Sequence, residues 1–321
     1  MRIGISGLGF GTHLMHTALT RDDCVVAGVT DFAPERMAAA SAQGIATFAT
    51  PAEMVAGAGL DAMVFASTPH VRGDAFDAAF GAGLPVFVEK PIAGTVAQAE
   101  ALVARAAGQR VMVGFSFRFH APVQRLLAAD LGRPMLANGE YMFDWLVPAE
   151  NWLWDPQKGG GFFTENSCHL FDVACALLGE PVRAYAEPVE DDRRNTATGA
   201  AVTLAFDTGA RAALTLGCIA TGGIRDFPRL DIAYENGQAK LEGREHMWTG
   251  LRMVRRGQGV ETMGADPETL GRTRYSDAFD HFLAAVRDGT PFAATLEDGL
   301  RAVRIADAIY RSIASGRAEE I

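Results

Sequence analysis

A glycine-rich turn directly after the first apolar segment constrains the fold of this chain most. Residues 2–6 have the pattern of a buried strand, Gly7-Leu8-Gly9-Phe10-Gly11-Thr12 follows, and a helical pattern continues to about residue 20. In a dinucleotide site, one glycine permits the tight turn and the next lets the backbone approach a pyrophosphate, which lies at the positive end of the helix. Thr12 stands where a third small residue is usual. The residues predicted to bind a dinucleotide here are Gly7, Gly9, Phe10, Gly11 and Thr12.

An acidic residue after the second predicted strand indicates which dinucleotide is bound. The strand pattern at 25–29 ends at Asp31, 22 residues beyond Gly9. An acid at this place binds the ribose hydroxyls of NAD and repels the additional phosphate of NADP. In the alternative interpretation, Asp31 only caps the helix that begins at Pro34. Because Arg36 could accept a phosphate, we expect NAD, with NADP as the alternative.

The first third of the chain alternates between strand and helix patterns. Further strands are predicted at 45–48, 62–67, 85–90 and 111–119, and helices at 51–56, 71–82 and 95–107. Such alternation implies right-handed crossovers and a parallel sheet. The sequence therefore predicts a doubly wound α/β domain.

One of these strands ends on a charged pair. Val86-Phe87-Val88 is followed by Glu89-Lys90, and Pro91 cannot continue a ladder of hydrogen bonds. The carboxyl ends of parallel strands form the ligand crevice, so Lys90 is predicted to be a cation held at that crevice. The alternative is a surface ion pair of little energetic meaning. The residues predicted to contact the cofactor from this edge are Ser67, Thr68, Pro69, His70, Glu89 and Lys90.

A single helix is the most informative element of the remainder. The pattern at 162–178 is apolar almost all round and is closed by Gly179, which indicates a buried helix. Glu165, His169 and Asp172 are spaced four and three apart, which in an α-helix places them on one face. A buried polar stripe requires partners or a polar cavity. In the alternative interpretation, Glu165 is favoured near the helix N-terminus and His169 belongs to a satisfied core network.

The second half is rich in strand patterns, with turn residues at Gly209 and Asn236-Gly237. Strands are predicted at 184–189, 200–206, 211–219, 230–234, 239–242 and 250–254, a mobile loop at 256–273, and helices at 276–287 and 296–315. These patterns predict a mostly antiparallel sheet with one face on helices and the other solvated or covered by a subunit. We expect two domains, 1–118 for the dinucleotide and 119–321 for substrate and oligomerisation.

Composition excludes several other classes of function. The formal net charge of −10 opposes binding to nucleic acid. The four cysteines show no paired short spacing, and His13 and His16 have no further ligands beside them, so no metal site is predicted. No signal-peptide pattern and no apolar run of about 20 residues is present, which favours a soluble, reduced, cytoplasmic protein without membrane contact.

Taken together, these motifs resemble the Gfo/Idh/MocA oxidoreductase family over essentially the whole chain. The motifs that carry the resemblance are Gly7-Leu8-Gly9-Phe10-Gly11, Thr68-Pro69, Glu89-Lys90-Pro91, Arg118-Phe119, the helix after Gly159–Gly161 with His169 and Asp172, and Glu297-Asp298-Gly299. The resemblance implies a Rossmann domain, then an open antiparallel sheet, with a nicotinamide cofactor at their junction. It also implies dimers or tetramers formed through the sheet face, and oxidation of a sugar or cyclitol hydroxyl or reduction of the ketone.

The resemblance also assigns roles to individual residues. Lys90 matches the catalytic lysine and His169 the acid-base histidine, with Glu165 or Asp172 orienting the imidazole, and Arg118 is expected at the cofactor. Three positions depart from the family pattern: Glu165 stands for the usual Asp, Ser167 for Gly, and Gly73 for a frequent His.

Two other functions remain open from the sequence. One is an NAD-dependent glycosidase or lyase of the same family that acts by transient oxidation. The other is a non-enzymatic regulator that senses the dinucleotide. The presence of both Lys90 and His169 argues against the regulator.

Overall fold

The structure is a computed structural model, and it describes residues 1–266, 268, 270 and 275–321. Its internal contacts divide the chain into two compact units, which are described separately. The first comprises residues 1–115 and 275–300, and the second comprises residues 116–274 and 301–321. The predicted functional domains, 1–118 and 119–321, stay a prediction.

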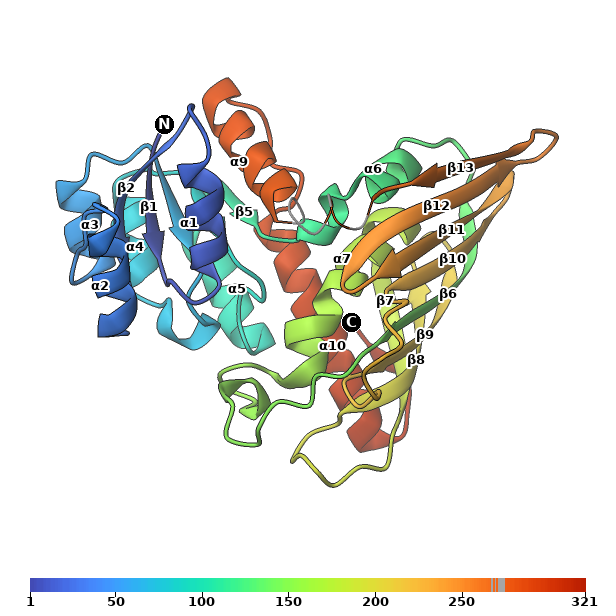
Figure 1. Cartoon of the computed structure of the whole chain (residues 1–321). Coiled ribbons are helices and arrows are strands. Elements are labelled where there is room, and N and C mark those ends of the chain that lie inside the picture. Colours follow the sequence, from blue (N-terminus) through green and yellow to red (C-terminus); the bar gives the residue numbers. More distant parts are fainter. Residues whose placement is uncertain (267, 269, 271–274) are drawn as a thin grey trace. The chain divides into compact units, whose positions relative to one another are not determined.

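The first unit is built on a five-stranded parallel sheet with the strand order β2-β1-β3-β4-β5 (Figure 1). The strands are β1 (Arg2–Ser6), β2 (Val25–Thr30), β3 (Ala62–Phe65), β4 (Val86–Val88) and β5 (Val111–Val113). Every residue of the three short strands is buried, as expected for a parallel sheet with both faces covered. The predicted doubly wound parallel sheet is confirmed.

Helices connect these strands, and one from late in the sequence joins them. The helices are α1 (Gly11–Leu19), α2 (Pro34–Ala42), α3 (Pro51–Gly57), α4 (Ala75–Gly81), α5 (Val96–Arg105) and α9 (Ser276–Asp288). Thr50 and Thr95 cap α3 and α5 by accepting backbone N–H bonds. The rings of Phe279 and Phe282 pack against Phe87 of β4, with centroids 6.0 and 5.5 Å away. This contact ties α9 to the sheet.

Three predicted elements of this unit are shorter than expected. Residues 45–48 form only a single bridge, between Thr47 and Val29. The helix predicted from 71 is a 3₁₀ turn, η1 (Pro69–Val71), followed by α4 from Ala75. The strand predicted to reach 119 ends at Val113, and η2 (Ser116–Phe119) follows it. Periodicity does not determine the structure of a short apolar run, which explains why the two strands were predicted too long.

The second unit is built on a nine-stranded sheet with the order β13-β12-β11-β10-β6-β9-β8-β7-β14. Its strands are β6 (Pro134–Met142), β7 (Pro181–Pro188), β8 (Gly199–Phe206), β9 (Arg211–Gly217), β10 (Arg229–Tyr234), β11 (Gly237–Arg244), β12 (Met247–Arg255), β13 (Val260–Gly264) and β14 (Glu319–Glu320). All neighbours are antiparallel except β6 and β9, so the predicted mostly antiparallel sheet is confirmed.

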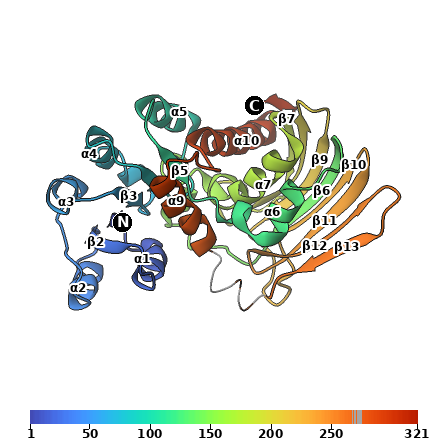
Figure 2. The same cartoon turned by 90° about the horizontal axis from the view of Figure 1, so that it is seen from above.

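Helices cover one face of this sheet (Figure 2). They are α6 (Ala121–Leu127), α7 (Cys168–Leu178) and the later part of α10 (Leu296–Ser315). Along β9, Ala212, Leu214 and Leu216 are buried, whereas Ala213 and Thr215 between them are exposed. This alternation gives the sheet a core face and an exposed outer face.

Two expectations for this unit are corrected. Part of the segment predicted as a mobile loop, residues 256–273, forms β13, which pairs with β12 through backbone hydrogen bonds that polar residues make equally well. Residues 267, 269 and 271–273 of that segment lie outside the described residues. The predicted helix 162–178 begins with a π-helical turn at Phe163–Ser167, and only α7 is α-helical. Gly161, with φ +80°, precedes it, and a Cβ there would lie 2.2 Å from the Tyr310 hydroxyl oxygen, so Tyr310 fits only against glycine.

Candidate functional site

The glycine-rich loop is held against the end of β3. Gly7 has φ +93°, and a Cβ on it would lie 2.3 Å from the backbone nitrogen of Ser67, so only glycine fits. Its N–H donates to the Thr30 carbonyl oxygen at 2.8 Å. A Cβ on Gly11, which opens α1, would lie 3.0 Å from the Ala66 Cβ. The loop is therefore fixed by contacts with β2 and β3.

The exposed side of the same loop fits a dinucleotide. A Cβ on Gly9 would have only the Arg36 guanidinium within 4 Å, at 3.5 Å or more, so the backbone there is approachable. Thr12 points its hydroxyl back to the Leu8 carbonyl, which keeps the loop turned toward the N-terminus of α1. Phe10 packs edge-on against Tyr275, with ring centroids 4.7 Å apart. These features are those that a pyrophosphate needs from backbone and helix end.

Asp31 is fixed at the end of β2. Its carboxylate accepts hydrogen bonds from the backbone N–H groups of Leu8 and, at 2.8 Å, of Ala33. The Arg36 Nη1 lies 3.5 Å from the same carboxylate, and the Arg36 side chain is 49% exposed. One edge of the loop therefore carries both an acid suited to ribose hydroxyls and a guanidinium suited to a phosphate.

The register of the parallel sheet brings three predicted segments to one edge. Ser6 of β1 is paired with Phe65 of β3, and Phe65 is paired with Val88 of β4. The residues that follow these positions therefore leave the sheet side by side. They are the glycine loop, Ser67 with Thr68, Pro69 and His70 of η1, and Glu89 with Lys90.

Lys90 is half-buried at this edge, and Glu89 is buried. A Cβ on Gly114 would lie 2.7 Å from the Glu89 Oε1, so the carboxylate fits against bare backbone. The Lys90 N–H donates to Glu89 Oε2 at 3.3 Å. Glu89 is therefore part of a packed interior, and the alternative of a surface ion pair does not apply to it.

Arg72 is a residue of this edge that the sequence reasoning missed. It is 2% exposed, and its guanidinium donates to the carbonyl oxygens of Ser67, Glu89 and Pro91. Burial lowers the pKa of Arg72 to about 10, while the Glu89 carboxylate opposes that shift, so the group stays cationic at neutral pH. The only sequence feature that could have pointed to Arg72 is its place close behind the Thr68-Pro69 turn.

In the second unit, His169 is held by an aromatic ring. The imidazole stacks on Phe117 of η2, with centroids 4.5 Å apart and planes 21° apart. Phe117 in turn contacts Tyr141 and Trp248 edge-on, at 6.1 and 6.3 Å. His169 and Glu165 are half-buried, whereas most of their neighbours in 163–178 are buried. The spacing of the aromatic residues gave no sign of this cluster, because its members come from separate elements.

Asp172 and Arg118 form a buried ion pair. The Arg118 Nε donates to Asp172 Oδ2 at 3.0 Å, and its Nη2 donates to the other carboxylate oxygen. Their side chains are 10% and 0% exposed. The pair joins η2 to α7 and so fixes the two elements that carry Phe117 and His169. That Arg118 binds the cofactor stays a prediction.

The π-helical turn changes the predicted stripe. Hydrogen bonds in a π-helix run from i to i+5, so the four-residue step from Glu165 to His169 is not the α-helical one. The stripe inferred from α-helical spacing therefore holds only for His169 and Asp172. The Asn166 side-chain amide donates to the Glu165 carboxylate. π-Turns of this kind are frequent at functional sites.

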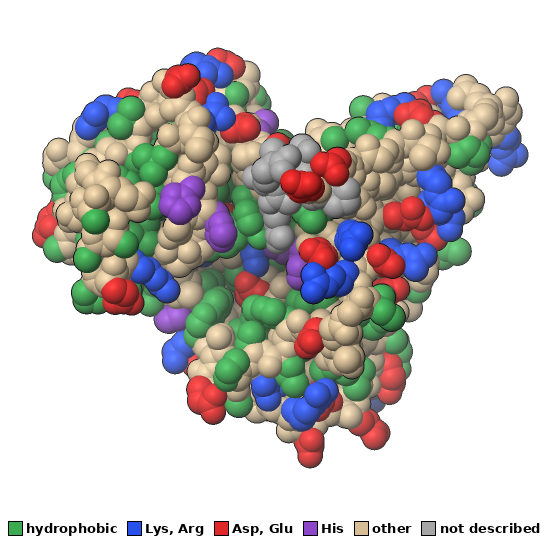
Figure 3. Space-filling model, in the orientation of Figure 1, with side chains coloured by type: hydrophobic (Ala, Val, Ile, Leu, Met, Phe, Trp, Pro, Cys, Tyr) green, Lys and Arg blue, Asp and Glu red, His purple; other side chains and the backbone are tan. Residues whose placement is uncertain are grey.

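The described residues outside this edge give no sign of a metal site. Among them, no group of three or more His, Cys, Asp and Glu side chains is suited to a metal ion, and the His13 ring packs on Phe10 and Tyr275. None of their helices has the length and apolar character to cross a membrane. Figure 3 shows basic and acidic side chains interspersed on the visible face, without a patch of one sign.

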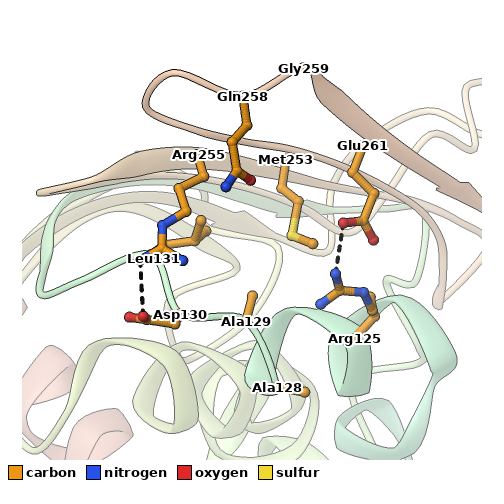
Figure 4. Close-up of a pocket in the computed structure, with 10 residues that line it drawn as sticks. All are labelled: Arg125, Ala128, Ala129, Asp130, Leu131, Met253, Arg255, Gln258, Gly259 and Glu261. Carbon is orange, nitrogen blue, oxygen red and sulfur yellow. Dashed lines mark hydrogen bonds and ion pairs between the residues drawn. The ribbon is translucent and has the colours of Figure 1, made fainter.

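A pocket of about 190 Å³ lies within the second unit, beside α6 and the β12–β13 hairpin (Figure 4). Its charged side chains are paired: Arg125 with Glu261 at 2.7 Å, and Arg255 with Asp130 at 3.1 Å. It includes none of the predicted site residues.

Comparisons with known proteins agree with this fold. A parallel sheet with a glycine loop at the start of α1 defines a dinucleotide-binding Rossmann domain. Residues 1–117 match the model of the oxidoreductase family's NAD-binding Rossmann fold, and residues 124–321 match the model of its C-terminal alpha/beta domain. The chain belongs to the Gfo/Idh/MocA family of oxidoreductases, which confirms the resemblance inferred from its motifs.

Individual relatives match along nearly their whole length. D-xylose 1-dehydrogenase (NADP(+)) 2 of Haloferax volcanii is 25% identical over 334 residues, covering 100% of both chains. Inositol 2-dehydrogenase 4 of Saccharopolyspora erythraea is 26% identical, covering 98% of this chain and 94% of its own. A solved structure of levoglucosan dehydrogenase with NADH and levoglucosan has a TM-score of 0.86 at 19% identity, covering 100% and 99% of the two chains. That last likeness concerns the fold.

The buried ion pair gives a testable prediction about stability. Asp172→Asn removes the carboxylate that binds the buried Arg118 guanidinium at two points, so we expect the free energy of unfolding of the second unit to fall by about 3–5 kcal/mol. All four tryptophans, at 145, 152, 154 and 248, lie in this unit, so denaturant unfolding followed by tryptophan fluorescence reports on it directly. Asp130→Asn is the matched control, because Asp130 is 79% exposed in its pair with Arg255. Equal losses in the two variants would contradict the assignment.

Proposed function

We propose that this protein is an NAD(P)-dependent dehydrogenase that oxidises a hydroxyl group of a sugar, cyclitol or related polyol, or reduces the corresponding ketone. The observation that carries the proposal is a pair of half-buried groups in one chain of this family. One is Lys90 on the carboxyl edge of the Rossmann sheet, and the other is His169, whose ring is fixed on Phe117. The xylose and inositol dehydrogenases among its relatives support the substrate class.

The residues act on the substrate oxygen. His169 takes the hydroxyl proton as general base, and Lys90 donates a hydrogen bond to the same oxygen and stabilises its negative charge. A nicotinamide held by the glycine loop and its rim would supply the hydride acceptor for the carbinol carbon, whose C–O bond would become a carbonyl. In the reverse direction, His169 returns the proton. Positioned acid-base help of this kind contributes about 10²–10⁴-fold to the rate.

Two acids support His169 in different ways. Asp172, bound by Arg118, anchors the helix that carries the imidazole. Glu165 lies on the π-turn before that helix and is proposed to orient the imidazole. Its longer arm, in place of the family's usual Asp, is proposed to select among substrates.

The glycine loop and its rim are proposed to hold the cofactor. Gly7, Gly9 and Gly11 present backbone to the pyrophosphate, and Asp31 accepts from the adenosine ribose. Ser67 to His70, Glu89 and Lys90 lie on the same edge and are proposed to line the nicotinamide end, and Arg118 is proposed to contact the cofactor. NAD is the proposed cofactor. NADP is the alternative, because the Arg36 guanidinium could bind its additional phosphate.

A second copy of the chain is proposed to cover the outer face of the nine-stranded sheet. Leu136, 60% exposed, points from β6 to that face. Its partner on β10 is Ala233, its neighbour on β9 is Arg211, and the small residues Ala213 and Thr215 are exposed further along β9. Such a face suits flat packing of one sheet on another, in a homodimer or homotetramer.

The catalytic roles predict the behaviour of two variants. After a screen of sugars, polyols and their keto forms with NAD(H) and NADP(H), read by nicotinamide absorbance, Lys90→Ala and His169→Ala should each lower kcat by about 10²–10⁴-fold. NADH affinity, measured by fluorescence, should stay near that of the wild type. His16→Ala, at an exposed histidine of α1, is the control and should keep full activity.

Other outcomes of that screen point elsewhere. Near-normal turnover in both variants would remove the assignment. Sugar release without accumulation of NADH would favour the glycosidase or lyase, and NAD binding without any turnover would favour the regulator.

The cofactor edge predicts opposite effects of two substitutions. Asp31→Asn keeps an acceptor for Leu8 but removes the charge that repels a phosphate, so the NAD-over-NADP ratio of kcat/KM should fall about tenfold. Arg36→Gln removes the phosphate partner, so the ratio should rise. An unchanged ratio in both variants argues against a role of this edge in selecting the cofactor.

The proposed assembly predicts that a charged substitution on the sheet face lowers the mass of the protein in solution. Sedimentation velocity should find a dimer or tetramer for the wild type, and Ala213→Arg, which puts a charge in the middle of the face, should shift it to monomer. Ala42→Arg, on the exposed side of α2, should leave the assembly intact. A monomeric wild type at micromolar concentration would refute the proposed interface.

A further inference from the structure

Arg72 is the one inward-pointing residue of an otherwise exposed or half-buried stretch, residues 67–75. Its side chain is 2% exposed, whereas Val71, Gly73 and Asp74 beside it are exposed. Burying a guanidinium is expensive unless its donors are satisfied. Arg72 precedes α4, which begins at Ala75, so the local backbone does not require a charged side chain at this position.

The contacts of Arg72 join the ends of two strands. Its Nε donates to the Ser67 carbonyl oxygen at 2.7 Å, in the segment after β3. Its Nη1 donates to the carbonyl oxygens of Glu89 and Pro91 at 2.6 and 2.8 Å, in the segment after β4. All three acceptors are backbone atoms at the edge that also carries the glycine loop.

The two acceptors after β4 lie on either side of Lys90. The Glu89 carbonyl belongs to the peptide bond that enters Lys90, and the Pro91 carbonyl belongs to the residue after it. A single guanidinium nitrogen therefore fixes the backbone before and after the lysine. The Nε of the same guanidinium donates to the Ser67 carbonyl oxygen at the same time. The single ammonium group of a lysine cannot reach all three carbonyl oxygens with the same geometry.

We propose that Arg72 is a positioning residue for Lys90, which sets where the ammonium stands by holding the backbone on both sides of it against the segment after β3. The inference rests on the proposed role of Lys90. Groups that act on a reacting atom must be held to about 0.5 Å, and a misplacement of about 1 Å costs on the order of 10²-fold in rate. Arg72 therefore acts through Lys90, without contact to the substrate.

Two variants at this position separate positioning from simple stability. Arg72→Met keeps the length but removes all donors, so kcat should fall about 10²-fold with NADH affinity within about threefold of the wild type. Arg72→Lys keeps the charge and some hydrogen bonds, so its kcat should lie between that of the wild type and that of Arg72→Met. Arg105→Met is the matched control, since Arg105 pairs at the surface with Asp77, and it should keep full activity. If the Met variant does not fold, the Lys variant decides alone: a loss of kcat of at least tenfold supports the proposal, and any smaller loss overturns it.

A double variant tests whether Arg72 acts through the lysine. In a Lys90→Ala background, Arg72→Lys should cause little further loss, because the group it positions is gone. A loss that multiplies with that of Lys90→Ala would overturn the proposal.

A readout independent of turnover separates this proposal from the proposed function. Hydrogen exchange of the peptide that contains Lys90 should be faster in Arg72→Lys than in the wild type, and unchanged exchange there overturns the proposal. Near-normal turnover of Lys90→Ala would remove the proposed function and leave the exchange result standing. Full turnover of the Arg72 variants beside an inactive Lys90→Ala would remove only the positioning role.

Discussion

The aligned carboxyl ends of β1, β3 and β4 are the constraint on which the candidate site depends. Ser6, Phe65 and Val88 are paired across these strands, so each strand delivers its next residues to the same edge. Strand-helix alternation with right-handed crossovers makes these strands parallel, so their carboxyl ends point to the same edge. A glycine loop, a Thr-Pro turn and a lysine that are far apart in sequence therefore become neighbours.

Buried charge is stabilised differently in the two units. Arg118 is neutralised by the Asp172 carboxylate in a two-point contact between η2 and α7. Arg72 is instead solvated by three backbone carbonyls, with the Glu89 carboxylate as the more distant compensating charge. The first arrangement locks two elements together, and the second fixes the path of the backbone around one residue. Both serve the elements that carry the proposed acid-base groups.

Sequence reasoning succeeded where a signal is local. The order of strands and helices predicted the parallel sheet, and Gly7 and Asp31 follow β1 and β2 directly, while their roles toward a cofactor stay predictions. Sequence reasoning missed contacts whose partners come from other elements. Arg72 is bound by segments 17 and 19 residues away, and Arg118 meets Asp172 across 54 residues.

Boundaries were predicted less well than the elements themselves. The π-turn at Phe163–Ser167 follows Gly161, which packs against Tyr310 of α10, and periodicity reveals neither the turn nor the contact. The strand β13 is polar and is held by its backbone pairing with β12, so its sequence gave a loop pattern. The short bridge at Thr47 shows the opposite case, an apolar run that forms no extended ladder.

The central claim is that an ammonium on the Rossmann unit and an imidazole on the second unit act on one substrate oxygen. A crystal structure of the protein with NAD⁺ and a polyol substrate tests it most directly. The account predicts that the Lys90 Nζ and an imidazole nitrogen of His169 both lie within about 3 Å of the same hydroxyl oxygen. A complex in which either group is turned away from that oxygen, with the substrate's carbinol carbon still facing the nicotinamide, would contradict it.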